Sequence, residues 1–309
     1  MIATIPHSRR KFLKTFSLAA VGLMTVQTSA TARPSKIYLQ EYSWRTFMER
    51  EGMDWQNDPI KYYQQLMSSV FKKLEPIIDS FQYFEEMRSS IDWTSFDIVS
   101  VYLNAVLHEK KNLNQRIDQV RKIAKFYAKS GAKIIVINPS PISWDEAEDK
   151  TDDELNTQVK ALNVLSKSIA EMGLLLAYHN HDAEMRNNGR ELHWMMQKTN
   201  PEYVRYCLDC HWIYRGSGNN EKELFKVIDL YADRIVELHL RQSSNGIWTE
   251  AFKEGDIDYH KIARALKYRN LKPRLVLEQA VEKGTPHTMS IDESHRLGVQ
   301  YANQIFIDF

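Results

Sequence analysis

Residues 174–184, with the sequence LLLAYHNHDAE, decide how we interpret the rest of the chain. A short apolar run leads directly into polar residues, which is typical of a strand buried on both faces of a parallel sheet and ending at its edge. Because side chains alternate along a strand, we expect His179 and His181 to share a face if the strand extends that far. Two neighbouring imidazoles suit a divalent metal, and two hydrogen-bonded loop histidines are the alternative.

Similar apolar runs recur on both sides of this stretch, mostly alternating with helical patterns. We predict strands over residues 36–42, 80–85, 97–103, 133–138, 174–178, 204–209, 235–240 and 274–278. We predict helices over residues 58–74, 113–130, 151–172, 191–198, 221–232, 259–269 and 291–306. Such alternation indicates a parallel sheet, and eight units favour a (β/α)8 TIM barrel of the α/β class. An open doubly wound sheet is the rival, but no G-x-G-x-x-G motif follows the first strand.

The first 32 residues form a separate segment. A basic block with paired arginines, SRRKFLK at residues 8–14, precedes an apolar stretch at 16–26, and Ala30-Thr31-Ala32 fits a signal-peptidase site. The segment closely resembles a twin-arginine export signal. We therefore predict a signal peptide at residues 1–32, a barrel at 33–309, and passage through the twin-arginine machinery to the periplasm. A membrane anchor or a cytosolic basic tail is the alternative, although the apolar run is short for a membrane span.

The net charge and the number of cysteines argue against a nucleic-acid-binding protein and against a disulfide-stabilised one. Removing the four basic residues of the leader from the total of 41 leaves 37 basic residues against 40 acidic ones, a net charge of −3. This balance argues against a nucleic-acid partner, which requires a basic face. The two cysteines, Cys207 and Cys210, are too few for a disulfide framework. Buried thiols are favoured over a C-x-x-C redox site, because the pair leaves a strand instead of opening a helix.

Polar residues lie at or just after the ends of the last four predicted strands, where a barrel collects its active-site groups. These residues are His179, His181 and Glu184 after the fifth strand, Asp209 and His211 at the end of the sixth, His239 and Arg241 at the end of the seventh, and Glu278 at the end of the eighth. A buried carboxylate is costly when unpaired, and one cation can satisfy several. The pattern predicts one divalent metal ion, of Mn, Co, Zn, Mg or Fe, with a purely structural network as the alternative.

The motifs YHNHDAE, LDCHW, ELHL, EGDID and LVLEQ together resemble the xylose-isomerase-like sugar phosphate isomerase/epimerase superfamily over roughly residues 113–309. The resemblance implies a TIM barrel whose fifth to eighth strands hold a divalent metal through Glu, Asp, His and Glu. Three of these ligands correspond to Asp209, His239 and Glu278. No glutamate ends the fifth strand here, so we expect His181 to replace it, with His179 as the alternative.

The resemblance also implies roles for the neighbouring residues. Glu184 resembles a catalytic acid/base, and Glu278 is its expected counterpart. His211 resembles a substrate-contacting histidine, although the spacing is D-x-H instead of the D-x-x-H of the family. We expect His211 to act in catalysis and Arg241, His179 and Trp212 to bind substrate.

The predicted activity is that of a metal-dependent sugar isomerase or epimerase that acts through an enediolate. Export and the lack of a Gly-rich phosphate loop favour a non-phosphorylated sugar or keto-sugar as substrate. A lyase or dehydratase of 3-keto-glycosides would use the same site. A sugar-binding barrel without catalysis is an alternative of another class, and an AP-endonuclease-like nuclease is disfavoured by the charge. A homo-oligomer is compatible with all of these hypotheses.

Overall fold

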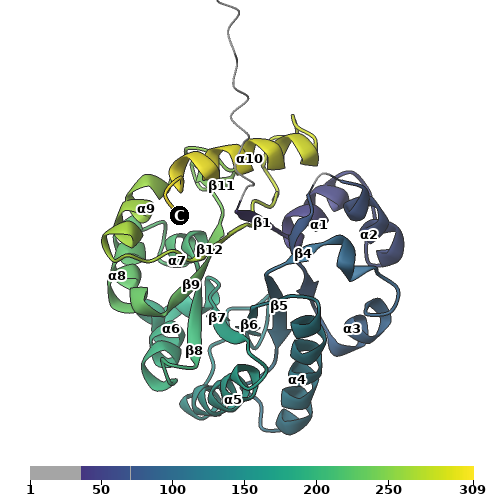
Figure 1. Ribbon diagram of the computed structural model, residues 1–309. Coiled ribbons are helices and arrows are strands. Elements are labelled where there is room, and N and C mark those ends of the chain that lie inside the picture. Colours follow the sequence, from purple (N-terminus) through teal and green to yellow (C-terminus); the bar gives the residue numbers. More distant parts are fainter. Residues whose placement is uncertain (1–35, 70) are drawn as a thin grey trace, which may run out of the picture. The chain divides into compact units, whose positions relative to one another are not determined.

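A ring of parallel strands forms the centre of the chain and is surrounded by helices (Figure 1). The computed structural model describes residues 36–69 and 71–309, so the predicted leader at residues 1–32 lies outside the described residues. The ring positions are held by β1 (Ile37–Gln40), β2 (Lys73–Glu75) with β3 (Ile77–Ile78), β4 (Asp97–Ile98) with β5 (Ser100–Ala105), β6 (Ile134–Pro139), β7 (Leu175–His179), β8 (Val204–Asp209), β9 (Ile235–Leu240) and β12 (Arg274–Leu277).

Helices follow the strands along the chain. They are α1 (Glu41–Arg50), α2 (Pro59–Ser68), α3 (Phe81–Met87), α4 (Leu113–Lys129), α5 (Asp152–Ala170), α6 (Arg186–Lys198), α7 (Cys210–Gly216), α8 (Glu221–Tyr231), α9 (Tyr259–Tyr268) and α10 (Ile291–Ile305), with short 3-10 turns η1 (Trp93–Ser95), η2 (Ala183–Met185) and η3 (Ala232–Arg234). A small hairpin of β10 (Ser243–Ser244) and β11 (Ile247–Trp248) follows β9. Among the described residues, no helix combines the length and the apolar character needed to cross a bilayer.

The sheet closes into a barrel. β1 pairs with β12 on one side and with β2 on the other. Pro76 alone separates β2 from β3, and Val99 alone separates β4 from β5. The order of paired strands begins with β3 and β5 and ends with β2 and β4. Since β2 and β3 form one strand position of the barrel and β4 and β5 form the next, the two ends of the sheet meet there. Eight strand positions therefore form the ring, and the (β/α)8 barrel predicted from the sequence is confirmed.

The second unit of the barrel differs from the prediction. The strand predicted at residues 80–85 is wrong, because this segment belongs to α3. Ser80 caps α3 by accepting a hydrogen bond from the Tyr83 amide, and Phe84 and Met87 bury one helical face. The strand of this unit lies earlier, at β2 and β3, so the helix predicted over 58–74 ends at Ser68.

Alternation along the strands separates two layers of the core. In β7, Leu176 and Tyr178 belong to the large apolar cluster that includes Leu162 of α5 and thus lies between strands and helices. Ala177 belongs to a smaller cluster with Cys207 inside the ring. His179 follows Ala177 by two residues and therefore points toward the barrel interior.

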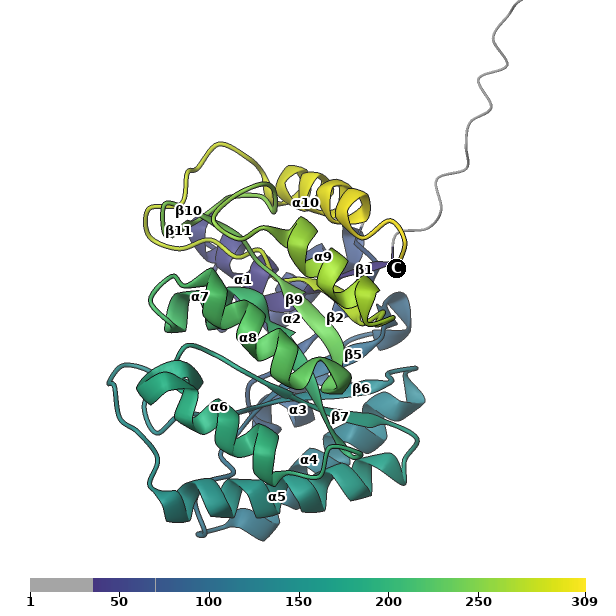
Figure 2. The same cartoon turned by 90° about the vertical axis from the view of Figure 1, so that its left-hand side faces the viewer.

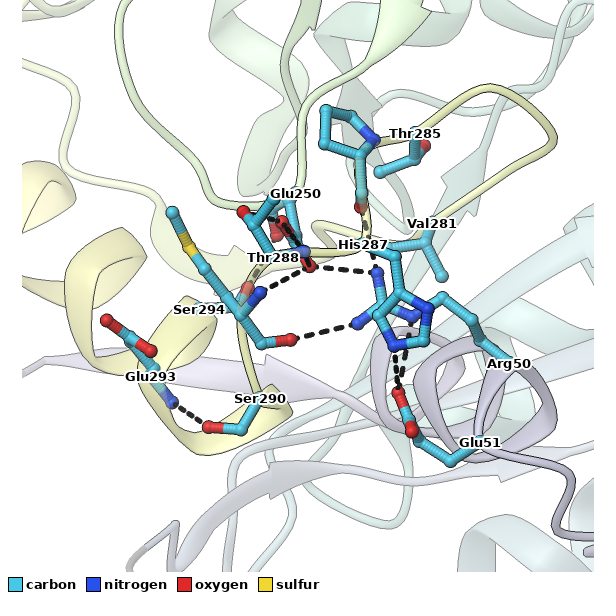
Figure 3. A network of polar contacts seen from close by, with 12 residues as sticks. Arg50, Glu51, Glu250, Val281, Thr285, His287, Thr288, Ser290, Glu293 and Ser294 are labelled. Atoms are coloured by element: carbon cyan, nitrogen blue, oxygen red, sulfur yellow. Dashed lines mark hydrogen bonds and ion pairs between the residues drawn. The ribbon is translucent and has the colours of Figure 1, made fainter.

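The seam between the first and last strands is reinforced at the mouth of the barrel. Arg50 of α1 donates hydrogen bonds to Glu250 (2.9 Å) and to the main-chain oxygens of Pro286 and Met289, both at 3.0 Å (Figure 3). Glu250 also accepts the Thr288 amide at 3.0 Å. The segment after β12 is thereby tied to α1. The β10–β11 hairpin lies at this mouth, and the C-terminus lies at the opposite end of the barrel (Figure 2).

Candidate metal centre and active site

Four adjacent strands deliver ligand-type side chains to one point inside the barrel mouth. His179 ends β7, Asp209 ends β8, His239 lies on β9 and Glu278 follows β12 directly. Asp209 and His239 are paired in register, which brings them to the same level of the ring. One ligand atom from each of the four residues lies within 4.8 Å of the others, and all four side chains are buried. We call these four residues the ligand cluster.

Asp209 has one carboxylate oxygen engaged and one free. Oδ1 accepts a hydrogen bond from the Trp212 amide at 2.8 Å and so caps helix α7. Oδ2 is buried and has no hydrogen-bond partner among the described residues, and its nearest cation is Arg241 Nη2 at 4.0 Å. Burial raises the pKa of Asp209 to about 6. The free oxygen is available for an additional positive charge.

His239 and Glu278 are in direct contact. His239 Nδ1 lies 2.6 Å from Glu278 Oε2, and its Nε2 lies 3.0 Å from Glu75 Oε2 deeper in the barrel. Arg241 pairs with the other oxygen of Glu278 and donates from Nε to its main-chain oxygen at 3.0 Å. Burial raises the pKa of Glu278, but Arg241 and His239 outweigh this effect and hold the pKa at about 2. Glu278 is therefore an anion at neutral pH.

His179 offers a free nitrogen to the same point. Its Nδ1 lies 3.5 Å from the Tyr102 hydroxyl, and its Nε2 is buried with no partner in the described part of the chain. Burial keeps the pKa of His179 well below its usual range, so the ring is neutral. A neutral imidazole nitrogen and a carboxylate oxygen, both buried and both unpartnered, fit the donor set of a divalent cation. The ligand cluster thus meets the chemical requirements of a metal site.

A cavity of about 430 Å³ opens next to the cluster. Glu278 and Arg241 line it, and so connect the cluster to solvent. Its other walls are formed by Gln40, Tyr42, Arg45, Glu49, Trp55, Ile77, Asp79, Tyr102, Asn104, Trp144, His181, Asp182 and Trp212. Polar and aromatic side chains predominate, which suits a polar ligand whose apolar faces stack on rings.

Arg241 is fixed within the cavity wall. The side chain is fully buried, and its guanidinium carbon lies 4.3 Å from the Trp248 ring centroid and 4.9 Å from that of Trp212. Stacking on two indoles and pairing with Glu278 leave it little freedom. Two of the residues expected to bind substrate, Arg241 and Trp212, therefore line the cavity.

The two histidines of the YHNH stretch take different positions. β7 ends at His179, so His181 lies in the following loop and outside the ligand cluster. His181 lines the cavity, with ring centroids 5.3 Å from both Trp144 and Trp212. Burial lowers its pKa to about 3. The geometry brings the alternative ligand, His179, to Asp209, while His181, the ligand expected first, lies in the cavity wall.

Glu184 and His211 lie away from the cluster and do not line the cavity. The Glu184 carboxylate accepts the His181 amide at 2.7 Å, and burial raises its pKa to about 7. His211 is buried with its ring 6.1 Å from that of Trp248, and burial lowers its pKa to about 2. The catalytic roles assigned to both residues stay predictions. Cys207 and Cys210 are free, buried thiols, as expected.

Sequence reasoning missed several residues around the cluster. Glu75 and Glu237 are fully buried below His239, and Tyr102 contacts His179. Asn180 is fully buried beside Asp209. Period-two alternation within IVELHL puts Glu237 on the same face as His239 and is a signal that could have found it. No comparable pattern marks Glu75, because it stands next to the strand break at Pro76.

The fold and the ligand cluster together define a TIM barrel with a candidate metal centre at the carboxyl ends of its strands. The model of the xylose isomerase-like TIM barrel family matches residues 65–298. The chain belongs to this family.

Known proteins agree with this assignment at low identity. The inosose dehydratase 2 of Bacillus cereus is 26% identical over 183 residues, which are 56% of this chain and 59% of the relative. A sugar phosphate isomerase/epimerase from Parabacteroides distasonis has 17% identity and a TM-score of 0.65, covering 91% of this chain and 97% of that one. The IolI protein with a bound zinc has 13% identity and a TM-score of 0.57, covering 88% and 98%.

Proposed function

We propose that the chain is a divalent-metal-dependent enzyme that isomerises, epimerises or dehydrates a non-phosphorylated sugar or keto-sugar. One observation carries the proposal: His179 and Asp209, which belong to the ligand cluster beside a polar, aromatic cavity, each have a buried atom, Nε2 and Oδ2, with no hydrogen-bond partner among the described residues. His179, Asp209, His239 and Glu278 would hold the metal. When bound, the metal would supply Lewis-acid polarisation of a substrate carbonyl.

The residues of the cavity supply the remaining requirements of this chemistry. Arg241 presents a permanent cation in the wall, which favours a substrate oxygen that gains negative charge. Transfer of a proton between two faces of a substrate needs groups on two sides of the cavity. His181 follows β7, and Glu49 lies on α1 after β1, four positions away around the ring. These two groups join Glu184 and Glu278, the pair predicted from the sequence, as candidates for proton transfer across a substrate.

A dehydratase is the second candidate. The curated relatives include dehydratases, but the match spans 59% of the length of the Bacillus cereus protein. Elimination uses the same first step, because the proton next to a carbonyl must leave before a β-hydroxyl can follow.

The test is incubation of the purified protein with ketoses, inososes and 3-keto-glycosides in deuterated water. Metal-stripped protein and protein reloaded with Mn²⁺, Co²⁺, Zn²⁺, Mg²⁺ or Fe²⁺ are compared. We expect metal-dependent deuterium incorporation, read by NMR, and loss of water in the mass spectrum if the enzyme is a dehydratase. Absence of metal-dependent exchange and elimination on all substrates would contradict the proposal and favour a sugar-binding barrel.

We also propose that residues 1–32 direct export through the twin-arginine pathway. The support is the Arg9-Arg10 pair followed by an apolar stretch and Ala30-Thr31-Ala32. Cell fractionation of the full chain, beside a variant with Arg9→Lys and Arg10→Lys, tests it. We expect the unaltered chain in the periplasm with Arg33 at its new N-terminus, and the variant retained in the cytoplasm. Equal retention of both would contradict the proposal.

A further inference from the structure

The asparagine between the two histidines of the YHNH stretch is fully buried and faces away from them. β7 ends at His179, whose last register partner in β8 is Cys207. Asn180 Nδ2 donates a hydrogen bond to the main-chain oxygen of Asp209 at 3.1 Å, and the Asp209 amide donates back to Asn180 Oδ1 at 3.2 Å. The side-chain amide thus continues the β7–β8 hydrogen-bond ladder after β7 has ended.

The orientation of this amide is determined by its partners. The N–H of Asp209 needs an acceptor and its carbonyl oxygen needs a donor, so only one orientation of Asn180 satisfies both. The Tyr206 hydroxyl donates a further hydrogen bond to Oδ1 at 2.7 Å. A buried hydrogen-bond network with every member satisfied is rigid. Asn180 therefore has a fixed place against the end of β8.

These contacts leave Asp209 with a single free polar atom. Its N–H and C=O are bound by Asn180, and its Oδ1 is bound by the Trp212 amide. Its Oδ2 alone has no hydrogen-bond partner in the described chain, and it lies 4.0 Å from Arg241 Nη2, which pairs with Glu278 of the ligand cluster. Main chain and side chain of Asp209 are thus fixed so that one oxygen points to the cluster.

We propose that Asn180 is a positioning residue of the metal centre, which holds Asp209 so that Oδ2 is presented to the cation. The inference rests on the proposed function, since it needs a metal at the ligand cluster. Outer contacts of this kind orient metal ligands, and their loss typically weakens metal affinity about 10- to 100-fold. An asparagine suits the position because its amide offers a donor and an acceptor side by side.

The test measures Zn²⁺ affinity by competition with a chromophoric chelator, without any substrate. Asn180→Ala removes both contacts to Asp209, and Asn180→Ser keeps one shorter polar group. The matched control is Tyr206→Phe, which removes the third hydrogen bond to the same amide and leaves Asp209 in place. We expect the Kd for Zn²⁺ to rise about 10- to 100-fold in Asn180→Ala and less in Asn180→Ser. Tyr206→Phe should stay within about threefold.

Urea unfolding of all three variants separates positioning from a structural role. Equal losses of stability in Asn180→Ala and Tyr206→Phe with an unchanged Kd would overturn the inference and leave the proposed function intact. Failure of the unaltered protein to bind any metal would overturn both. If Asn180→Ala does not fold, the Kd of Asn180→Ser decides, and a value equal to that of Tyr206→Phe counts against the inference.

Discussion

Two buried groups of charged side chains in this barrel differ in whether their polar atoms have partners. In the first half, Glu41 accepts hydrogen bonds from Arg45 (2.8 Å), the Tyr63 hydroxyl (2.7 Å) and the Ile77 amide (2.9 Å). Arg45 completes its contacts with the carboxylate of Asp79 and the Ile77 carbonyl. We call this group the Glu41–Arg45 network.

In the ligand cluster of the second half, His179 and Asp209 each keep one atom without a hydrogen-bond partner in the part of the chain that the structure describes. Glu41 and Arg45 are as deeply buried as the ligand cluster, yet of these two groups only the ligand cluster has unpartnered atoms among the described residues. Unmet hydrogen-bonding capacity that several neighbouring residues share therefore separates a binding site from a structural network.

Replacing one ligand should abolish metal binding while the fold is retained. In Asp209→Asn the cap of α7 survives, because asparagine also caps helices. We expect metal-dependent exchange to fall about a thousandfold, since a metal contributes several kcal/mol and about 4 kcal/mol corresponds to that factor. Metal analysis and initial rates of deuterium exchange check this. Retention of one metal per chain would remove Asp209 from the ligand cluster.

Breaking the Glu41–Arg45 network should lower the stability of the fold and leave metal binding unchanged. Glu41→Gln leaves the buried Arg45 without its main partner, so we expect a loss of about 3 kcal/mol in the free energy of unfolding. Metal content should not change. Urea denaturation measures the effect, with Asp97→Asn at the exposed Lys73–Asp97 pair as control, where a change below about 1 kcal/mol is expected. A metal-depleted but stable Glu41→Gln protein would refute the division of roles.

Protonation of the buried His295, which lies outside both groups, should lower the stability of the fold at acidic pH and leave metal binding unchanged. His295 of α10 is buried against Phe47 and Phe71, and burial lowers its pKa from 6.5 to about 4. The unfolded chain therefore takes up the proton first, and this stabilising contribution is lost as the pH falls from 6.5 toward 4. Between pH 7 and pH 5 the unaltered protein should lose about 2 kcal/mol more than His295→Leu.

Urea unfolding at the two pH values checks the histidine prediction. Parallel losses in both proteins would show that His295 does not titrate as stated. The free Nε2 of His295 is not part of any candidate ligand group among the described residues, which shows that one unpartnered atom does not make a site.

The smallest effect is expected at the rim of the cavity. Trp144 is 59% exposed and lies edge-on to His181. Trp144→Ala should raise KM for a sugar substrate about threefold, because a ring contact contributes about 0.7 kcal/mol, and should leave stability unchanged within about 0.5 kcal/mol. Steady-state kinetics test this, with the exposed Tyr268→Ala on α9 as control. An equal change in both variants would exclude stacking at the rim.

The two halves of the barrel also differ in how well their strands could be predicted from the sequence. Strands β6, β7, β8, β9 and β12 are mostly apolar, and the polar residues at or after their ends predict that Asp209, His239 and Glu278 meet. In the first half, β2 and β3 are short and are interrupted by Pro76, so local pattern does not mark them as a strand and favours the short SFQYFE segment instead. Local pattern cannot show that Ser80 caps a helix there.

The choice between the two histidines depended on a boundary. Alternation gives His179 and His181 a common face only while the strand continues, and β7 stops at His179. That end is set by Asn180, whose contacts are with β8 and are not visible in the local sequence. Glu75 was missed for the same reason, because its proximity to His239 depends on how the ring closes.

The pairing of β1 with β12 has a consequence for biosynthesis. Ile37 lies opposite Leu275, so the first strand of the described chain cannot complete its pairing until the last strand has been synthesised. Contacts between such distant segments form slowly, because a large loop must close before they bring any gain. We expect a ribosome-bound chain to hold β1 as an exposed, unpaired edge until β12 emerges, and this interval is when chaperone capture and misassembly compete with ring closure.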